Sequence, residues 1–254
     1  RKTYFDAAGL FFRRAKDITG KRLLSELLTP EVIIATFDHF YSSSASGTLK
    51  KTIAAIEKVY LGCQTLGWTK NETPITENLR AHIKQYSDDF NVRKPRYGYI
   101  EHDAKRIVDY LYQTNSKFAL AAEIGLGCGL RKSEIAGLRG NDFDTEKMII
   151  RVIGKGGRFR EVKLPDAIAE KINTSQQFIF SPKRSWKKAF YDAITNATIA
   201  LKIDIKGVHR LRSNFAQNVY EELIEKGATD GEARDQVSQA LGHNRRDVTH
   251  GYIP

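Results

Sequence analysis

The sequence predicts a mainly α-helical protein with a small antiparallel β-sheet, an α+β chain of two domains. Apolar residues recur at helical spacing through most of the 254 residues. Two short strand-like runs flank a glycine-rich turn in the second half and predict one β-hairpin. A basic, proline-interrupted stretch separates a helical N-terminal domain, residues 1–92, from a second domain, residues 99–254.

The N-terminal domain is expected to be a set of helices with polar breaks. Thr29-Pro30 predicts a helix start, because proline is favoured at the first helical position. The serine-rich run 42–46 breaks the pattern, and the next helix buries an apolar face that includes Ile53 and Ile56. Three lysines fall on the other side and are expected to face DNA phosphates, with a solvated surface as the alternative: Lys50, Lys51 and Lys58.

Residues 93–98 are expected to connect the two domains. The stretch is polar, and its proline disfavours a helix, so an extended path is predicted. Its cations suit a path along a DNA backbone, and they are Arg93, Lys94 and Arg96.

The second domain is expected to alternate between helices and one hairpin. The turn at 154–158 holds three glycines, which supply the positive φ angles of a tight connection. Gly242 stands where a helix C-cap is expected. Helices are predicted at 104–112, 117–126, 131–138, 186–201, 209–226 and 231–241, and strands at 148–153 and 159–164.

Charge and composition narrow the class of partner. The chain carries 41 Lys and Arg against 30 Asp and Glu, a net charge of +11, which favours a polyanion such as nucleic acid. No run reaches the ~18 apolar residues of a membrane span, so a cytoplasmic protein is expected. Cys63 and Cys128 lack metal-ligand spacing and are expected to be buried, reduced thiols, so no structural metal is predicted. The sequence offers neither a cluster of carboxylates for two-metal chemistry nor a P-loop, and no cofactor is expected.

Charged or polar residues lie on the apolar faces of two predicted helices. Arg131 and Glu134 share a helical face with Ile135, and an inward-facing cation needs a partner. Taken alone, the pair indicates a structural salt bridge. His209 and Arg212 lie one turn apart at a helix start, where both can point at a phosphate, although a core histidine is the ordinary alternative.

Together with three further residues, these form an ordered set that resembles the tyrosine recombinase, or phage-type integrase, family. The motif at 129–135 (GLRKSEI) resembles the family's first arginine motif, Gly154-Lys155-Gly156 its hairpin lysine, and His209-x-x-Arg212 its histidine-arginine motif. His243 and Tyr252 keep the family's nine-residue interval. The resemblance covers about residues 100–254, and the first 90 match only in length and helical character, as a core-binding domain.

The resemblance implies a site-specific DNA recombinase that cuts and rejoins strands through a 3′-phosphotyrosyl link, without metal or ATP. Tyr252 is the expected nucleophile, and Arg131 and Arg212 the expected neutralisers of phosphate charge. Glu134 is expected to orient Arg131, and Arg158 to contact DNA. The remaining roles are a hydrogen-bond donor for His243, a base or positioning group for His209 and a general acid for Lys155.

The resemblance also implies partners. Double-stranded recombination sites, a homotetramer in the synaptic complex, a monomer in free solution and accessory DNA-bending proteins are expected, in the bacterial cytoplasm and at the nucleoid. Two alternatives remain open. A type IB topoisomerase would relax DNA with the same residues, and a non-catalytic relative would only bind its DNA site.

Overall fold

The computed structural model describes residues 2–69, 72–87, 97–154, 156–242 and 251–253. The chain divides into two compact units, Arg1–Arg93 and Lys94–Pro254. The described residues are mostly helical and include one three-stranded antiparallel sheet, so the predicted fold class is confirmed.

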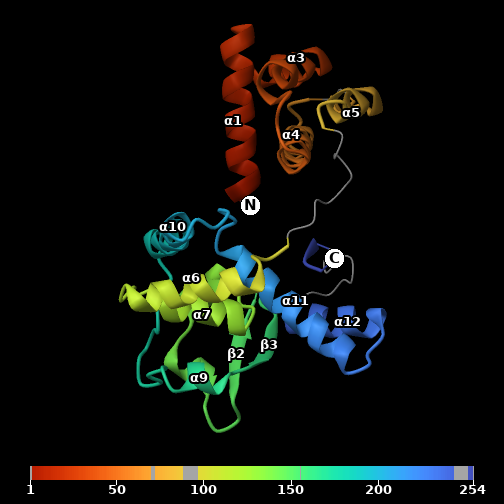
Figure 1. Cartoon of the computed structure of the whole chain (residues 1–254). Helices are drawn as coiled ribbons and strands as arrows, with labels where there is room; N and C mark the ends of the chain where they lie inside the picture. Colours follow the sequence, from red (N-terminus) through yellow and green to blue (C-terminus); the bar gives the residue numbers. More distant parts are fainter. Residues whose placement is uncertain (1, 70–71, 88–96, 155, 243–250, 254) are drawn as a thin grey trace. The chain divides into compact units, whose positions relative to one another are not determined.

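The described residues of the first unit form helices joined by turns and loops. Phe11, Phe37, Ile33 and Ile56 are fully buried and form the centre of its core. This core is buried between helices because each contributes one apolar face. Its helices among the described residues are α1 (Lys2–Thr19), α2 (Leu24–Leu27), α3 (Pro30–Tyr41), α4 (Ser46–Thr65) and α5 (Glu77–Lys84), and Figure 1 labels all of them except α2.

Local signals set the predicted helix boundaries of this unit. The Thr29 hydroxyl accepts a hydrogen bond from the amide of Val32, and Pro30 is the first residue of α3, as predicted. Ile53 and Ile56 on α4 are buried. Lys50, Lys51 and Lys58 are exposed, so the predicted separation of the two faces is confirmed.

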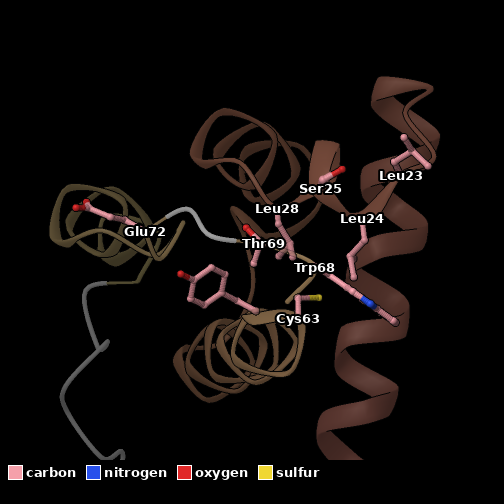
Figure 2. A pocket seen from close by; sticks show the side chains of 9 residues that line it. Leu23, Leu24, Ser25, Leu28, Cys63, Trp68, Thr69 and Glu72 are labelled. Carbon is pink, nitrogen blue, oxygen red and sulfur yellow. The ribbon is translucent and has the colours of Figure 1, made fainter. Parts of the chain in front are cut away.

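The first unit also contains a small pocket of about 210 Å³. Figure 2 shows Trp68, Cys63 and Leu28 among the side chains around it. Its lining residues, all within the described part of the chain, include the carboxylate of Glu72.

The second unit packs helices around a small sheet. Its elements, drawn in Figure 1, are α6 (Glu101–Gln113), α7 (Ala119–Gly127), α8 (Lys132–Gly137), the 3₁₀ turn η1 (Gly140–Asp142), β1 (Phe143–Asp144), β2 (Ile149–Ile153), β3 (Phe159–Lys163), α9 (Asp166–Ala169), α10 (Arg184–Ala200), α11 (His209–Glu225) and α12 (Asp230–Ala240).

The sheet has the order β1-β2-β3, and both pairs are antiparallel. Val152 lies opposite Arg160, and Ile150 opposite Val162. Ile150, Val152 and Val162 are buried, so this face of the hairpin is turned to the core. The hairpin was predicted, whereas β1 was missed because two residues carry no alternation pattern.

Helix α7 lies in the core of this unit and has few polar side chains. Ala121, Ala122 and Ile124 are fully buried in it. A Cβ atom added at Gly125 would lie 3.6 Å from Leu211 of α11, so the two helices pack closely. This packing places the start of α11 beside the segment that follows α7.

The first described residues of the second unit are anchored on α11. The amide of Tyr99 donates to Asn214 Oδ1 at 2.9 Å, and Asn214 Nδ2 donates to the Tyr99 carbonyl at 2.6 Å. Lys206 Nζ donates to the carbonyl of Gly98 at 3.1 Å. Gly98, placed by the sequence at the end of the connection, is therefore held by the body of this unit. Residues 93–96 of that connection lie outside the described residues.

Candidate active site

Arg131 and Glu134 form the ion pair that the sequence predicted. Arg131 Nη1 lies 2.7 Å from Glu134 Oε1, and the Arg131 amide donates to Oε2 at 2.8 Å. Arg131 itself has extended backbone, φ −71° and ψ 149°, and precedes α8 as its N-cap. The predicted helix therefore starts one residue too early, because the Glu134 carboxylate caps it by binding back to the Arg131 amide.

Arg212 is almost fully buried, with 1% of its surface exposed. Its Nη1 donates to the Gly129 carbonyl, and its Nη2 donates to the Leu241 carbonyl at 2.6 Å. Burial, aided by repulsion from Arg131, lowers the pKa of Arg212 to about 10. The guanidinium is still protonated at neutral pH, and it ties the segment between α7 and α8 to the end of α12.

Gly129 is required at this junction by both its backbone and its surroundings. Its φ is +63°, and an added Cβ would lie 2.2 Å from the Phe215 ring. We expect Gly129→Ala to lower the free energy of unfolding by about 2–3 kcal/mol, from overpacking and left-handed strain. Urea denaturation measures this.

Gly227→Ala is the matched control for Gly129→Ala. Gly227 has φ +88°, yet an added Cβ there would meet nothing within 4 Å. It isolates the backbone cost, about 1 kcal/mol. Equal losses in the two variants would show that the contact with Phe215 is relieved without cost.

Tyr252 lies against the helices of its own chain. Its hydroxyl is 2.9 Å from His209 Nε2, and it is 8% exposed. Tyr252 and Ile253 pack in a cluster with Val237 and Leu241. Tyr252 is also close enough to Arg212 to interact with it electrostatically. Three residues predicted from distant parts of the sequence therefore lie in one place.

Arg160 is a residue of this site that sequence reasoning missed. It lies on β3, and its guanidinium forms a two-pronged pair with Glu134, with Nη1 to Oε1 at 3.2 Å and Nη2 to Oε2 at 2.8 Å. The strand alternation could have placed it on the buried face with Val162. Its partner, 26 positions away, could not be read from the sequence.

Among the described residues, three guanidinium groups surround the carboxylate of Glu134: those of Arg131, Arg160 and Arg212. Burial by itself would raise the pKa of Glu134, but hydrogen bonds from Arg160 and from the Arg131 amide outweigh this effect. The pKa is lowered to about 2. Arg212 Nη1 lies 3.9 Å from Oε2. Ionised Glu134 leaves two positive charges in excess, so the cluster is suited to an anion.

Other predicted residues of the site are not placed. Lys155, His243, Arg93, Lys94 and Arg96 lie outside the described residues, and Arg158 is exposed in the hairpin turn. Their neighbours in sequence are informative. A Cβ atom added at Gly154 would lie 3.2 Å from Glu134 Oε1. A Cβ atom added at Gly242 would lie 3.0 Å from Arg160 Cδ. The residues directly before Lys155 and His243 therefore border the cluster.

Within the described ranges, no group of three or more His, Cys, Asp or Glu side chains is arranged to hold a metal ion. Over the same part of the chain, no helix is long and apolar enough to cross a membrane.

The chain belongs to the phage integrase family. The model of that family matches residues 100–254, which include all of the second-unit elements described above. The fold and the order of the site residues agree with this membership, so the family resemblance seen in the sequence is confirmed.

Two curated relatives show how much of the protein is covered. The chain is 25% identical over 166 residues to tyrosine recombinase XerA of Thermococcus kodakarensis, covering 59% of this chain and 55% of the relative. It is 27% identical over 150 residues to tyrosine recombinase XerC of Proteus mirabilis, covering 51% and 45%. The chain thus spans about half the length of these relatives.

Solved structures share the fold. The XerH site-specific recombinase bound to palindromic difH substrate, in a post-cleavage complex, superposes with a TM-score of 0.71 at 16% identity, covering 97% of this chain and 75% of the other. A lambda integrase dimer bound to a COC′ core site gives 0.66 at 16% identity, covering 95% and 69%. At these identities the likeness concerns the fold.

Proposed function

We propose that this protein is a site-specific DNA recombinase that cleaves a strand with Tyr252, holds the 3′ end as a phosphotyrosyl link and then rejoins it to another strand. The observation that carries the proposal is the Tyr252 hydroxyl, 2.9 Å from His209 Nε2, beside the Arg131–Glu134–Arg212 cluster. A phenol, a base and cations are the groups that a metal-free attack on a phosphodiester needs.

Charge neutralisation is the first task, because the nonbridging oxygens of a phosphodiester repel nucleophiles. The Arg131 side chain is 24% exposed and can donate to such an oxygen. Arg212 adds a second positive charge from beneath the surface. A preorganised donor of this kind contributes about 10²–10³ in rate.

Proton transfer is the second task, since tyrosine has a reference pKa of ~10. As the bond from Tyr252 Oη to phosphorus forms, the phenolic proton passes to His209 Nε2. The bond from phosphorus to the 5′ oxygen breaks, and Lys155 supplies the proton to that oxygen, with His243 as a further donor. The reverse reaction with a new 5′ hydroxyl needs no ATP, because the phosphotyrosyl link keeps the bond energy.

A covalent-capture experiment tests the proposal. The wild-type chain is incubated with a randomised library of nicked duplexes, in which the nick lets the 5′ fragment escape. We expect a protein–DNA adduct that survives denaturation, with the DNA attached to Tyr252 by peptide mapping. Attachment to another residue, or binding without an adduct, would support the non-catalytic alternative. Relaxation of supercoiled plasmid without exchange between two duplexes would support the topoisomerase alternative.

We also propose the assembly in which the chain acts. Exchange between two double-stranded sites requires four active sites, so a homotetramer on DNA is expected, formed from monomers and aided by DNA-bending proteins at a bacterial nucleoid. Strand exchange whose rate depends steeply on protein concentration, with a tetramer by light scattering on DNA, supports this arrangement.

The lysine face of α4 is proposed to contact the DNA backbone. All three lysines are exposed, and Lys58 Nζ also lies 5.3 Å from the Tyr4 ring centroid. We expect Lys50→Ala with Lys51→Ala to weaken duplex binding regardless of sequence and to reduce the slope of log K against log salt by about 2. Fluorescence anisotropy over a salt series measures both.

The control for this pair is Lys226→Ala at the C-cap of α11, an exposed lysine that pairs with Glu222. Its salt slope should equal that of the wild type. An unchanged slope in the double variant would instead mean that this face of α4 is only solvated.

A further inference from the structure

We propose, resting on the function proposed above, that Arg160 is a positioning residue for strand cleavage: it holds Glu134, and through Glu134 it orients Arg131 toward the phosphate. Sequence reasoning did not select Arg160, and it is distinct from the groups that would touch DNA.

The burial of Arg160 argues against direct contact between this side chain and DNA. Its side chain is 10% exposed, against 24% for Arg131. The register of the hairpin pairs Arg160 with Val152, which is buried, so the arginine projects from the core face of the sheet. A DNA phosphate can reach Arg131 more readily than Arg160.

The hydrogen bonds show how Arg160 acts. Each of its terminal nitrogens donates to a different oxygen of Glu134. Arg131 binds the same two oxygens through Nη1 and its amide. The carboxylate therefore accepts hydrogen bonds from two elements, β3 and the N-cap of α8. With Arg160 in place, Glu134 cannot rotate without breaking several charge-assisted hydrogen bonds, and the Arg131 guanidinium is fixed with it.

The same side chain borders two other parts of the site. A Cβ atom at Gly154 would lie 3.2 Å from Arg160 Nη1, and one at Gly242 would lie 3.0 Å from Arg160 Cδ. Gly154 directly precedes Lys155, and Gly242 directly precedes His243. The guanidinium of Arg160 thus fills the space between the backbone segments that lead to both of these residues.

The geometry requires arginine rather than any cation. A planar guanidinium presents parallel donors that match both oxygens of a carboxylate, whereas an ammonium group is a point charge. Arg160→Lys keeps the charge next to Glu134 and removes the fork. This substitution therefore separates positioning from electrostatics.

The test is single-turnover cleavage of a nicked duplex recovered by covalent capture on the wild-type chain. We expect Arg160→Lys to slow adduct formation by about 10- to 100-fold, as for a small misplacement of a catalytic group. DNA affinity should stay within about 2-fold, because no phosphate contact is removed. Arg151→Lys is the matched control: it weakens an arginine–carboxylate pair with Asp144 in the same sheet, and its cleavage rate should be that of the wild type.

A double-mutant cycle identifies the route of the effect. If Arg160 acts through Arg131, the variant with both Arg131→Lys and Arg160→Lys should cleave about as slowly as Arg131→Lys alone. Multiplying losses, or a loss that disappears after correction for the folded fraction from thermal melting, would overturn the inference.

Failure of the inference is distinguishable from failure of the proposed function. A wild-type adduct at Tyr252 with a wild-type rate in Arg160→Lys rejects only the positioning role. If the wild-type chain forms no adduct, the recombinase proposal is rejected first, and the positioning role falls with it.

Discussion

Tyr252→Phe is expected to abolish the covalent protein–DNA adduct while leaving fold and DNA affinity close to wild type. The substitution removes one oxygen, which pairs with His209 Nε2 at 2.9 Å, and keeps the ring that packs with Leu241 and Val237. Because His209 is exposed, water can take the lost bond, and the cost to stability is about 1 kcal/mol or less. The rate should fall by at least about 10³-fold, as expected on loss of a nucleophile.

Denaturing gels of the captured complex measure this loss. Tyr220→Phe is the matched control, since the Tyr220 ring packs against the same cluster as Tyr252 and its hydroxyl bonds Asp230 at 2.6 Å. That variant should form the adduct at the wild-type rate. An adduct that persists in Tyr252→Phe would mean that another residue attacks the phosphorus.

Glu134→Gln is expected to cause the largest loss of stability. The amide keeps the volume of the carboxylate but leaves three buried or half-buried guanidinium groups without their anion. Removing one partner of a buried ion pair costs about 3–5 kcal/mol. Cleavage should fall as well, because Arg131 and Arg160 lose their common partner.

The pH dependence of this effect has a definite sign. The pKa of Glu134 is about 2 in the folded chain, below its ordinary value of 4.5. Its stabilising contribution is therefore complete above the ordinary value and is lost as pH falls toward the folded value. The difference in unfolding free energy between wild type and Glu134→Gln should be large at neutral pH and should shrink between about pH 5 and pH 2.

Urea denaturation at neutral and acidic pH gives this difference. Glu222→Gln is the control, because Glu222 pairs with Lys226 on the surface of α11. An exposed pair of this kind contributes little to stability, because solvent screens the two charges. A pH-independent cost of Glu134→Gln would show that packing, not charge, explains the loss.

Local patterns accounted for most of the secondary structure. The Thr29-Pro30 helix start, the hairpin and the course of α11 follow from capping, glycine content and periodicity over neighbouring residues. The strand β1 and the helix α9 were missed because two and four residues are too short to show a period. The Arg131–Glu134 pair was predictable since its members are three residues apart.

The sequence by itself thus determined most of the elements, the charged groups on apolar faces and, through an ordered motif set, the family. Only the tertiary structure decided what those groups contact. Arg212 binds carbonyls 83 and 29 positions away, and Tyr252 lies beside a histidine 43 positions away. Arg160 joins the site for the same reason: a buried polar group takes whichever partner the packing brings within reach, and packing depends on the whole chain.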